Sequence, residues 1–316
     1  MATYVVTGVS RGLGWAFLSN LSSDSQNTVI GLVRNKVDTE ERAAKEFGGR
    51  PNIHILQADM TDYKSLQKAA EDTSKITGGS LDYLIGNAAA LPDSEAYANI
   101  GDLQVFRDSH LLIAKDPTAF EKDFAWTMQT NVIGNVHLIY SFLPLVMKGK
   151  TKKVIAISSG VGDIEINRKF DLEINPLYAT SKSALNAIIA KFSAQYAKNG
   201  VLFMSICPGV VATNATVHDN ATEEQKQKVG QFFGGLQRYA PNFTGPVPAE
   251  ESVKDVLAVI RKSSLENGDG GSASKTPIRE EVIKKMTGID ATTPINFGRK
   301  DGYDHPKPVG PAPPKK

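Results

Sequence analysis

The chain has 316 residues, which is enough to bury the core of one large α/β domain or of two small ones. Hydrophobic residues make up 41% and charged residues 22%, which is typical of a globular protein and excludes a disordered or fibrous one. The 36 Lys and Arg residues nearly balance the 34 Asp and Glu residues, so no net field would attract nucleic acid or an anionic membrane. We therefore expect neither as a partner.

The cysteine usage and the start of the chain bear on the compartment. The single cysteine, Cys207, lies in an apolar run, so we expect a buried, inert thiol, no intramolecular disulfide and a reducing compartment. The chain begins directly with a strand-like segment and contains neither an apolar signal segment nor an apolar span of about 18 residues. These features predict a cytoplasmic protein.

Short apolar runs alternate with segments of helical period along most of the chain. The runs predict strands at 3–7, 28–33, 52–56, 81–86, 153–158 and 202–207, and helices at 12–23, 38–47, 62–76, 118–147, 176–198 and 249–263. This alternation predicts an α/β fold, a doubly wound parallel sheet of Rossmann type with helices on both faces. Ligands of such a sheet bind at the carboxyl ends of the strands, where the strand order reverses.

Three segments, at 91–117, 160–176 and 214–248, are longer than a minimal strand–helix repeat requires. In the third, Thr222 and Gln225 have capping-box spacing ahead of a short helix, and we interpret 214–248 as a candidate substrate lid. Its aromatic residues suggest an apolar ligand, although packing explains them as well; they are Phe232, Phe233, Tyr239 and Phe243. Residues 91–117 fit surface decoration as well as they fit a function.

The pattern weakens after residue 263, so we assign 1–263 to one catalytic domain and 264–316 to a C-terminal extension. The extension has a Gly/Ser-rich stretch at 266–275 and a Pro/Lys-rich end at 305–316, which predict flexibility. Between them, Pro277 and Gly288 bracket one amphipathic helix. A seventh strand would be expected near 265–276, but the sequence has no apolar run there.

A glycine turn joins the first predicted strand to the first predicted helix. Its glycines, Gly8, Gly12 and Gly14, allow backbone N–H groups and the helix N-terminus to approach a pyrophosphate closely. Because the turn opens a βαβ series, it predicts a dinucleotide site. An NAD-preferring site would have an acidic residue about 20 positions further on, where this chain has Arg34. Arg11 could flank the same 2′-phosphate, so the sequence favours NADP(H).

Tyr178 and Lys182 open a predicted helix four positions apart, so their side chains project from the same face. A phenol has a pKa near ~10, and lowering it to neutrality requires on the order of 4 kcal/mol. The ammonium of Lys182 would supply part of that, and it could also bind the ribose hydroxyls of the cofactor. The spacing alone is weak evidence, because it occurs by chance in many helices.

Two further residues strengthen this interpretation. Ser159 ends the strand before the Tyr178 helix, where its hydroxyl can hold a substrate carbonyl. Asn131 lies inside a predicted helix, where its propensity is poor, and this indicates a specific hydrogen-bonding role such as fixing a water beside Lys182. A proton could then pass from solvent through Lys182 to Tyr178, and we expect no metal in the site.

These motifs occur in the order typical of the short-chain dehydrogenase/reductase family, which residues 3 to about 263 resemble. The motifs are TGVSRGLG at 7–14, Asp59, GNAAA at 86–90, Asn131, ISS at 157–159, YATSK at 178–182 and PGVVAT at 208–213. The resemblance implies a catalytic tetrad of Asn131, Ser159, Tyr178 and Lys182. It also implies a cofactor site of Gly8, Ser10, Arg11, Gly12, Leu13, Gly14, Arg34, Asp59, Met60, Asn87, Ala88, Tyr178, Lys182, Pro208, Gly209, Val211 and Thr213.

Individual roles follow from the same resemblance. Asp59 would contact the adenine ring, Asn87 would support the central strand and the adenine ribose, and Thr213 would bind the nicotinamide carboxamide. Two departures from the family pattern stand out. Ala89 replaces a glycine, and Tyr178 follows Ser159 by 19 positions, which is longer than in minimal members and leaves Ser158 as a rival for the hydroxyl role.

The expected function is NADPH-dependent, reversible reduction of a ketone or aldehyde, with Tyr178 as the general acid. Within the family the chain most resembles fungal carbonyl reductases and ketoreductases, which implies fungal secondary metabolism and a small, apolar carbonyl substrate. Two alternatives stay open: a dinucleotide-binding sensor or scaffold without redox chemistry, and an enzyme that catalyses cyclisation beside reduction. The family also implies a homodimer or a homotetramer.

Overall fold

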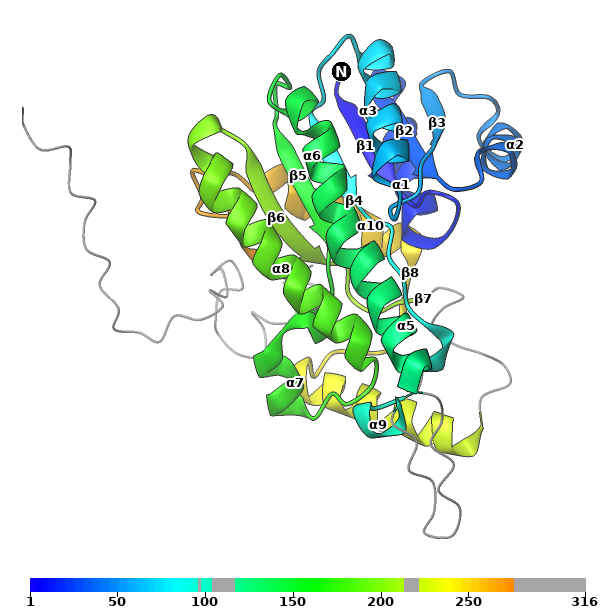
Figure 1. Cartoon of the computed structure of the whole chain (residues 1–316), viewed down its shortest axis with the longest axis vertical. Helices are drawn as coiled ribbons and strands as arrows, with labels where there is room; N and C mark the ends of the chain where they lie inside the picture. Colours follow the sequence, from blue (N-terminus) through cyan, green and yellow to red (C-terminus); the bar gives the residue numbers. More distant parts are fainter. Residues whose placement is uncertain (96–97, 104–116, 213–221, 276–316) are drawn as a thin grey trace, which may run out of the picture.

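The structure is a computed structural model that describes residues 1–95, 98–103, 117–212 and 222–275 (Figure 1). Within these residues, seven parallel strands form one sheet in the order β3-β2-β1-β4-β5-β6-β9. Their bounds are β1 Thr3–Thr7, β2 Thr28–Val33, β3 Ile53–Gln57, β4 Tyr83–Gly86, β5 Lys153–Ile157, β6 Leu202–Cys207 and β9 Ala273–Lys275. A separate parallel pair joins β7 Val211–Ala212 to β8 Val247–Pro248.

Helices cover both faces of this sheet (Figure 1). On one face lie α3 (Tyr63–Thr77), α6 (Gly134–Val146) and α8 (Pro176–Tyr196), and on the other lie α1 (Gly12–Ser22), α2 (Lys36–Phe47) and α10 (Ala249–Lys262). Around the carboxyl ends of the strands lie α5 (Pro117–Met128), α7 (Ile164–Phe170) and α9 (Glu223–Tyr239). Single turns occur at α4 (Ile100–Leu103), η1 (Asp93–Glu95), η2 (Gln129–Ile133), η3 (Gly160–Gly162) and η4 (Ala197–Asn199).

The predicted α/β fold is confirmed, because all six predicted strands and all six predicted helices occur near their expected bounds. The strand order reverses between β1 and β4, which pair with each other in parallel register. Chains leaving these strands diverge to opposite sides, so a crevice opens above their carboxyl ends. The predicted helix at 118–147 is interrupted by η2, a π-helical turn that separates α5 from α6.

A seventh strand is present, which the sequence did not indicate. Strand β9 has three residues and pairs with β6 from Ser205↔Ala273 to Cys207↔Lys275. It lies in the Gly/Ser-rich stretch that we interpreted as a linker, so the sheet continues past residue 263 to Lys275. The sequence of β9 has no apolar run, because backbone hydrogen bonds and not buried side chains hold this edge strand. One bond beside it joins the Gly271 N–H to the Phe203 carbonyl at 2.8 Å.

Three predictions concern residues outside the described ranges. The amphipathic helix between Pro277 and Gly288 and the Pro/Lys-rich end belong to 276–316, and the first part of the candidate lid belongs to 213–221. The predicted capping box is confirmed, since Thr222 and Gln225 exchange hydrogen bonds at the start of α9. Among the helices of the described residues, none is long and apolar enough to cross a membrane.

A buried carboxylate joins segments at the amino ends of the central strands. Asp82 is 8% exposed, and its oxygens accept the Thr3 N–H at 3.0 Å, the Lys150 N–H at 2.9 Å and the Thr151 N–H at 3.2 Å. Burial raises the pKa of the Asp82 carboxyl, but these donors outweigh burial and the net pKa lies below the ordinary value. One side chain therefore joins the starts of β1 and β4 to the turn before β5.

We expect Asp82→Asn to lower the free energy of unfolding by about 1–3 kcal/mol at pH 7, because a buried amide cannot accept all of these donors. Since the folded pKa is depressed, the stabilisation is present above the ordinary pKa of about 3.9 and is lost as the pH falls through the folded pKa. Urea denaturation at pH 7 and near pH 3 measures this. The exposed Asp255→Asn of α10 is the control, and an equal loss in the two variants at pH 7 would contradict the assignment.

Candidate active site

The glycine turn between β1 and α1 has the shape of a phosphate cradle. Gly8 and Gly12 adopt positive φ angles of 72° and 56°, which side-chain-bearing residues rarely adopt. A Cβ added to Gly14 would lie 2.0 Å from the Gly8 carbonyl oxygen, so only glycine fits there. The first residues of α1 receive no capping hydrogen bond from the Arg11 side chain. Backbone donors at this helix N-terminus are thus available to an anion, and the cradle fits a dinucleotide pyrophosphate.

Two exposed arginines flank this cradle. Arg11 lies in the turn and Arg34 follows β2, and neither guanidinium has a hydrogen-bond or ion-pair partner among the described residues. A third arginine was missed by sequence reasoning. Arg42 of α2 stacks on Trp15 at 3.8 Å from the ring centroid and donates to the Ser10 carbonyl at 3.0 Å, so it braces the turn from outside.

Other predicted cofactor residues lie at the ends of the neighbouring strands. The Asn87 amide donates to the Thr7 carbonyl at 2.9 Å, and the Thr7 hydroxyl accepts the N–H groups of Asn87 and Ala88, which ties β4 to β1. The Asp59 carboxylate accepts both the N–H and the hydroxyl of Thr61 at 2.8 Å.

The remaining predicted cofactor residues lie beside these or after β6. Met60, next to Asp59, is 7% exposed and packs against Gly134. Gly209 has a φ of 82°, and the Pro208 carbonyl accepts the Ser252 hydroxyl at 2.7 Å. Val211 is buried in β7, and Thr213 lies outside the described residues.

Tyr178 and Lys182 lie one turn apart on α8, beside the end of β5. Lys182 is 2% exposed, and its ammonium donates to the Ile157 carbonyl at 2.7 Å. Its Nζ lies 5.3 Å from the centroid of the Tyr178 ring. Gly162 allows η3 to pack closely against α8, because a Cβ there would lie 2.9 Å from the Lys182 Cβ. The helix therefore places both side chains near the carboxyl ends of the strands.

The pKa of Tyr178 differs from the expectation that Lys182 brings the phenol toward neutrality. Burial raises the pKa of Tyr178 well above its ordinary value, with smaller contributions from Cys207 and Glu95. Burial also lowers the pKa of Lys182 to about 8, although Cys207 opposes this shift. Loss of hydration thus outweighs the attraction between phenolate and ammonium, and among these side chains the phenol is protonated at neutral pH.

The two serines after β5 have different surroundings. Ser158 is 3% exposed, and its hydroxyl donates to the Asn186 side chain at 2.7 Å. Ser159 is half-buried and accepts only a long bond of 3.4 Å from the Val161 N–H at the start of η3. The Ser159 hydroxyl can therefore donate to a ligand, whereas the Ser158 hydroxyl already donates its hydrogen bond to Asn186.

Asn131 lies in the π-helical turn and is completely buried. Its amide accepts the Ala90 N–H at 2.6 Å and donates to the Ala90 carbonyl at 2.9 Å and to the Ser181 hydroxyl at 3.0 Å. The specific role expected for this residue is present, but the amide holds the chain after β4 against α8. The role of Asn131 in fixing a water beside Lys182 stays a prediction.

Cys207 was expected to be buried, and this is wrong, while the expected inertness of its thiol stays a prediction. The residue is only partly buried at the end of β6, and its sulfur accepts the Gly160 N–H at 3.1 Å. Its charge contributes to raising the pKa of both Tyr178 and Lys182. The apolar run around Cys207 predicted a position in the core. Cys207 is the last residue of β6, however, and the carboxyl ends of the strands border the crevice.

The candidate lid contributes an apolar wall near Tyr178. Phe232, Leu236 and Tyr239 of α9 pack with Tyr178 against a small buried cluster of Val161, Ile166 and Leu172. The rings of Phe170 and Tyr239 meet edge to face at 5.2 Å. The aromatic residues of α9 thus pack against α7 and share a cluster with Tyr178.

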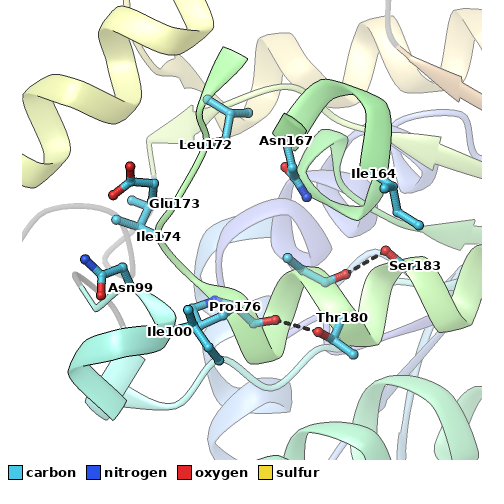
Figure 2. Close-up of a pocket in the computed structure, with 11 residues that line it drawn as sticks. Asn99, Ile100, Ile164, Asn167, Leu172, Glu173, Ile174, Pro176, Thr180 and Ser183 are labelled. Carbon is cyan, nitrogen blue, oxygen red and sulfur yellow. Dashed lines mark hydrogen bonds between the residues drawn. The ribbon is translucent and has the colours of Figure 1, made fainter. Parts of the chain in front are cut away.

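A cavity of about 570 Å³ lies on another side of α8 (Figure 2). Asn99, Ile100, Asn167 and Ile174 are among its lining residues, together with Thr180 and Ser183 of α8. Thr180 and Ser183 follow Tyr178 by two and five positions, which places them on a different helix face from Tyr178 and Lys182. The cavity includes no member of the tetrad and is distinct from the crevice at the strand ends.

Comparisons with known proteins agree with this geometry. The family model described as short chain dehydrogenase matches residues 2–224. The short chain dehydrogenase virK of Hypocrea virens is 50% identical over 272 residues, which cover 86% of this chain and 96% of virK. The short-chain dehydrogenase/reductase iacC of Pestalotiopsis fici is 45% identical, over 86% of this chain and 96% of iacC.

Among solved structures, an NADPH-bound carbonyl reductase from chicken fatty liver superposes with a TM-score of 0.64 at 24% identity, covering 87% of this chain and 96% of that one. The carbonyl reductase Sniffer of D. melanogaster gives the same values. These two similarities concern the fold. The chain belongs to the short-chain dehydrogenase family. It is an oxidoreductase of that family, and its cofactor class is a nicotinamide dinucleotide.

Proposed function

We propose that this chain reduces a ketone or aldehyde to an alcohol with NADPH, and that Tyr178 is the proton donor. The observation that carries the proposal is the geometry of α8, which places the Tyr178 ring 5.3 Å from the Nζ of the buried Lys182, at the end of β5. A protonated phenol can donate its proton to a carbonyl oxygen that gains negative charge, and the nearby ammonium would stabilise the phenolate that is left. When bound, the dinucleotide would supply the hydride.

The neighbouring side chains have complementary roles in this proposal. Ser159 would donate a hydrogen bond to the substrate carbonyl and stabilise the charge that develops on its oxygen. Lys182, with a pKa of about 8, would return a proton to Tyr178 and hold the cofactor ribose. Asn131 would keep the chain after β4 against α8 through Ala90 and Ser181, so that the substrate side of the crevice keeps its shape.

The cofactor would be NADPH, held by the glycine turn and by Arg11 and Arg34. The two exposed guanidiniums support this choice, because each can pair with the 2′-phosphate oxygens that NADH lacks. Apolar residues of α9 beside Tyr178 support an apolar substrate. Exposed apolar side chains along α5 and α6, at Trp126, Ile133 and Tyr140, support self-association as a homodimer or homotetramer.

The fungal sources of virK and iacC support a fungal setting only, and the role in secondary metabolism stays a prediction. The cytoplasmic location also stays a prediction.

Tyr178→Phe should lower kcat by about a hundred- to ten-thousandfold, because removal of the hydroxyl removes the proton donor. NADPH binding should persist, since the ring stays in place. The measurement is NADPH oxidation with a panel of aldehydes and ketones, alongside calorimetric NADPH binding. The matched control is Tyr83→Phe. It changes a half-buried tyrosine that stacks on Tyr4 at the amino ends of β1 and β4. Unchanged turnover in Tyr178→Phe would reject the proposal.

Ser159→Ala should lower kcat by about a hundredfold or more, because one donor to the developing oxyanion is lost. Ser158→Ala should instead cost about 1 kcal/mol of stability through its lost bond to Asn186, with turnover largely retained. Steady-state kinetics and urea denaturation of both variants separate the two serines. The reverse pattern would assign the hydroxyl role to Ser158.

Arg34→Ala should weaken NADPH binding by about ten- to a hundredfold, the loss expected for one charged hydrogen-bonding partner. NADH binding should change little, since its ribose carries a hydroxyl at the 2′ position. Calorimetric titration with both dinucleotides measures the difference. Arg261→Ala, an exposed arginine in the last turn of α10, serves as the control. Equal losses for NADPH and NADH would exclude a 2′-phosphate contact at Arg34.

A further inference from the structure

Glu95 is a completely buried carboxylate in the excursion after β4. One of its oxygens accepts the Leu177 N–H at 2.7 Å, and the other accepts the Tyr178 N–H at 2.9 Å. These donors lie in the first turn of α8, more than eighty positions further along the chain. The excursion therefore reaches the proton donor of the proposed reaction through a single side chain.

The start of α8 needs such a partner because its local sequence provides none. Pro176 occupies the first helical position and has no N–H, and the N-cap residue Asn175 adopts a left-handed conformation with φ 62°. In the described part of the chain, the Asn175 side chain makes no capping hydrogen bond. Glu95 thus takes over the capping role, and its charge is favourable at the positive end of the helix dipole.

Backbone contacts fix the excursion at the same place. The Asn175 N–H donates to the Ala98 carbonyl at 3.1 Å, and the Ala98 N–H donates to the Glu95 carbonyl at 3.1 Å. Upstream, Asn131 holds Ala90 by two hydrogen bonds. Ala90 is therefore held by the π-helical turn, and Glu95 and Ala98 are held by the start of α8.

The charged surroundings of Glu95 come from two packed helices. Asp123 of α5 disfavours its ionisation, and the Tyr178 phenol of α8 is in turn affected by its charge. Burial raises the pKa of Glu95 to about 7, the two backbone donors oppose this, and Asp123 adds to it. A negative Glu95 raises the pKa of Tyr178 and so helps to keep the phenol protonated.

We propose that Glu95 is a positioning residue for Tyr178, which fixes the first turn of the catalytic helix and makes reduction sensitive to pH through its own ionisation. The proposal rests on the proposed carbonyl reduction. Ionised Glu95 accepts both N–H groups, whereas the protonated carboxyl is a poor second acceptor. Activity should therefore fall on the acid side as Glu95 takes up a proton, with an apparent pKa of about 7.

The test compares wild type with Glu95→Gln, which preserves shape but cannot ionise. We expect kcat to fall by about tenfold at pH 8 with KM for NADPH little changed, since small misplacements of a reacting group are costly. The acid limb near pH 7 should disappear from the profile of the variant. Hydrogen exchange of the Leu177 and Tyr178 amides, which needs no turnover, should be faster in Glu95→Gln.

Two further variants separate positioning from loss of stability. Asp82→Asn changes another buried carboxylate that accepts backbone N–H groups, at the amino ends of the strands and away from Tyr178. This variant should keep the wild-type pH profile of activity. Asp123→Asn leaves the cap intact and should move the acid limb to lower pH, because a repulsive charge is removed. This variant keeps the proposal testable even if Glu95→Gln folds poorly.

The outcomes are distinguishable from those of the proposed function. If wild type reduces carbonyls and Glu95→Gln retains its kcat and its acid limb, the positioning role is wrong while the reduction stands. Unchanged amide exchange at Leu177 and Tyr178 in Glu95→Gln overturns the capping role whether or not wild type turns over. An acid limb that Asp123→Asn leaves in place also overturns the assignment to Glu95.

Discussion

The arrangement of the site depends on a buried ammonium that must be satisfied. An unpaired charge in an apolar interior is very unfavourable, so Lys182 can be buried only if its hydrogen bonds are made. The Ile157 carbonyl at the end of β5 accepts one of them at 2.7 Å, which brings α8 close to the sheet. Gly162 permits that approach because it has no side chain. Tyr178, one turn earlier, is consequently placed over the strand ends where a substrate would lie.

Most of the fold could be predicted because the strands that carry the core are also the most apolar segments. Strands β1, β2, β5 and β6 are almost entirely buried, so their hydrophobic runs report their positions directly. The edge strand β9 gives no such signal, since three small or polar residues are held there by backbone pairing with β6. The π-helical turn was also invisible, because it interrupts the helix without changing the apolar pattern on either side.

The candidate site divides along a similar line. Three residues of the proposed tetrad follow a strand or lie in the first turns of a helix, so the positions of Ser159, Tyr178 and Lys182 could be inferred from order along the chain. Glu95, Arg42 and Cys207 could not, because each acts on a segment that is distant in sequence: Glu95 on α8, Arg42 on the glycine turn and Cys207 on η3. The pKa of Tyr178 also depends on burial, which spacing does not reveal, and in the chain without its cofactor burial raises this pKa.

The electrostatics of the site bear on the proton transfer. Burial, Cys207 and Glu95 all raise the pKa of Tyr178, so these groups stabilise the phenol over the phenolate. Donation of the phenol proton to a carbonyl leaves a phenolate, and abstraction of a proton from an alcohol begins from one, so both directions of the reaction share this charged state. A positive charge close to the ring therefore assists reduction and oxidation alike. Among the described residues, Lys182 is the cation beside Tyr178, and its lowered pKa weakens that assistance as the pH rises above about 8.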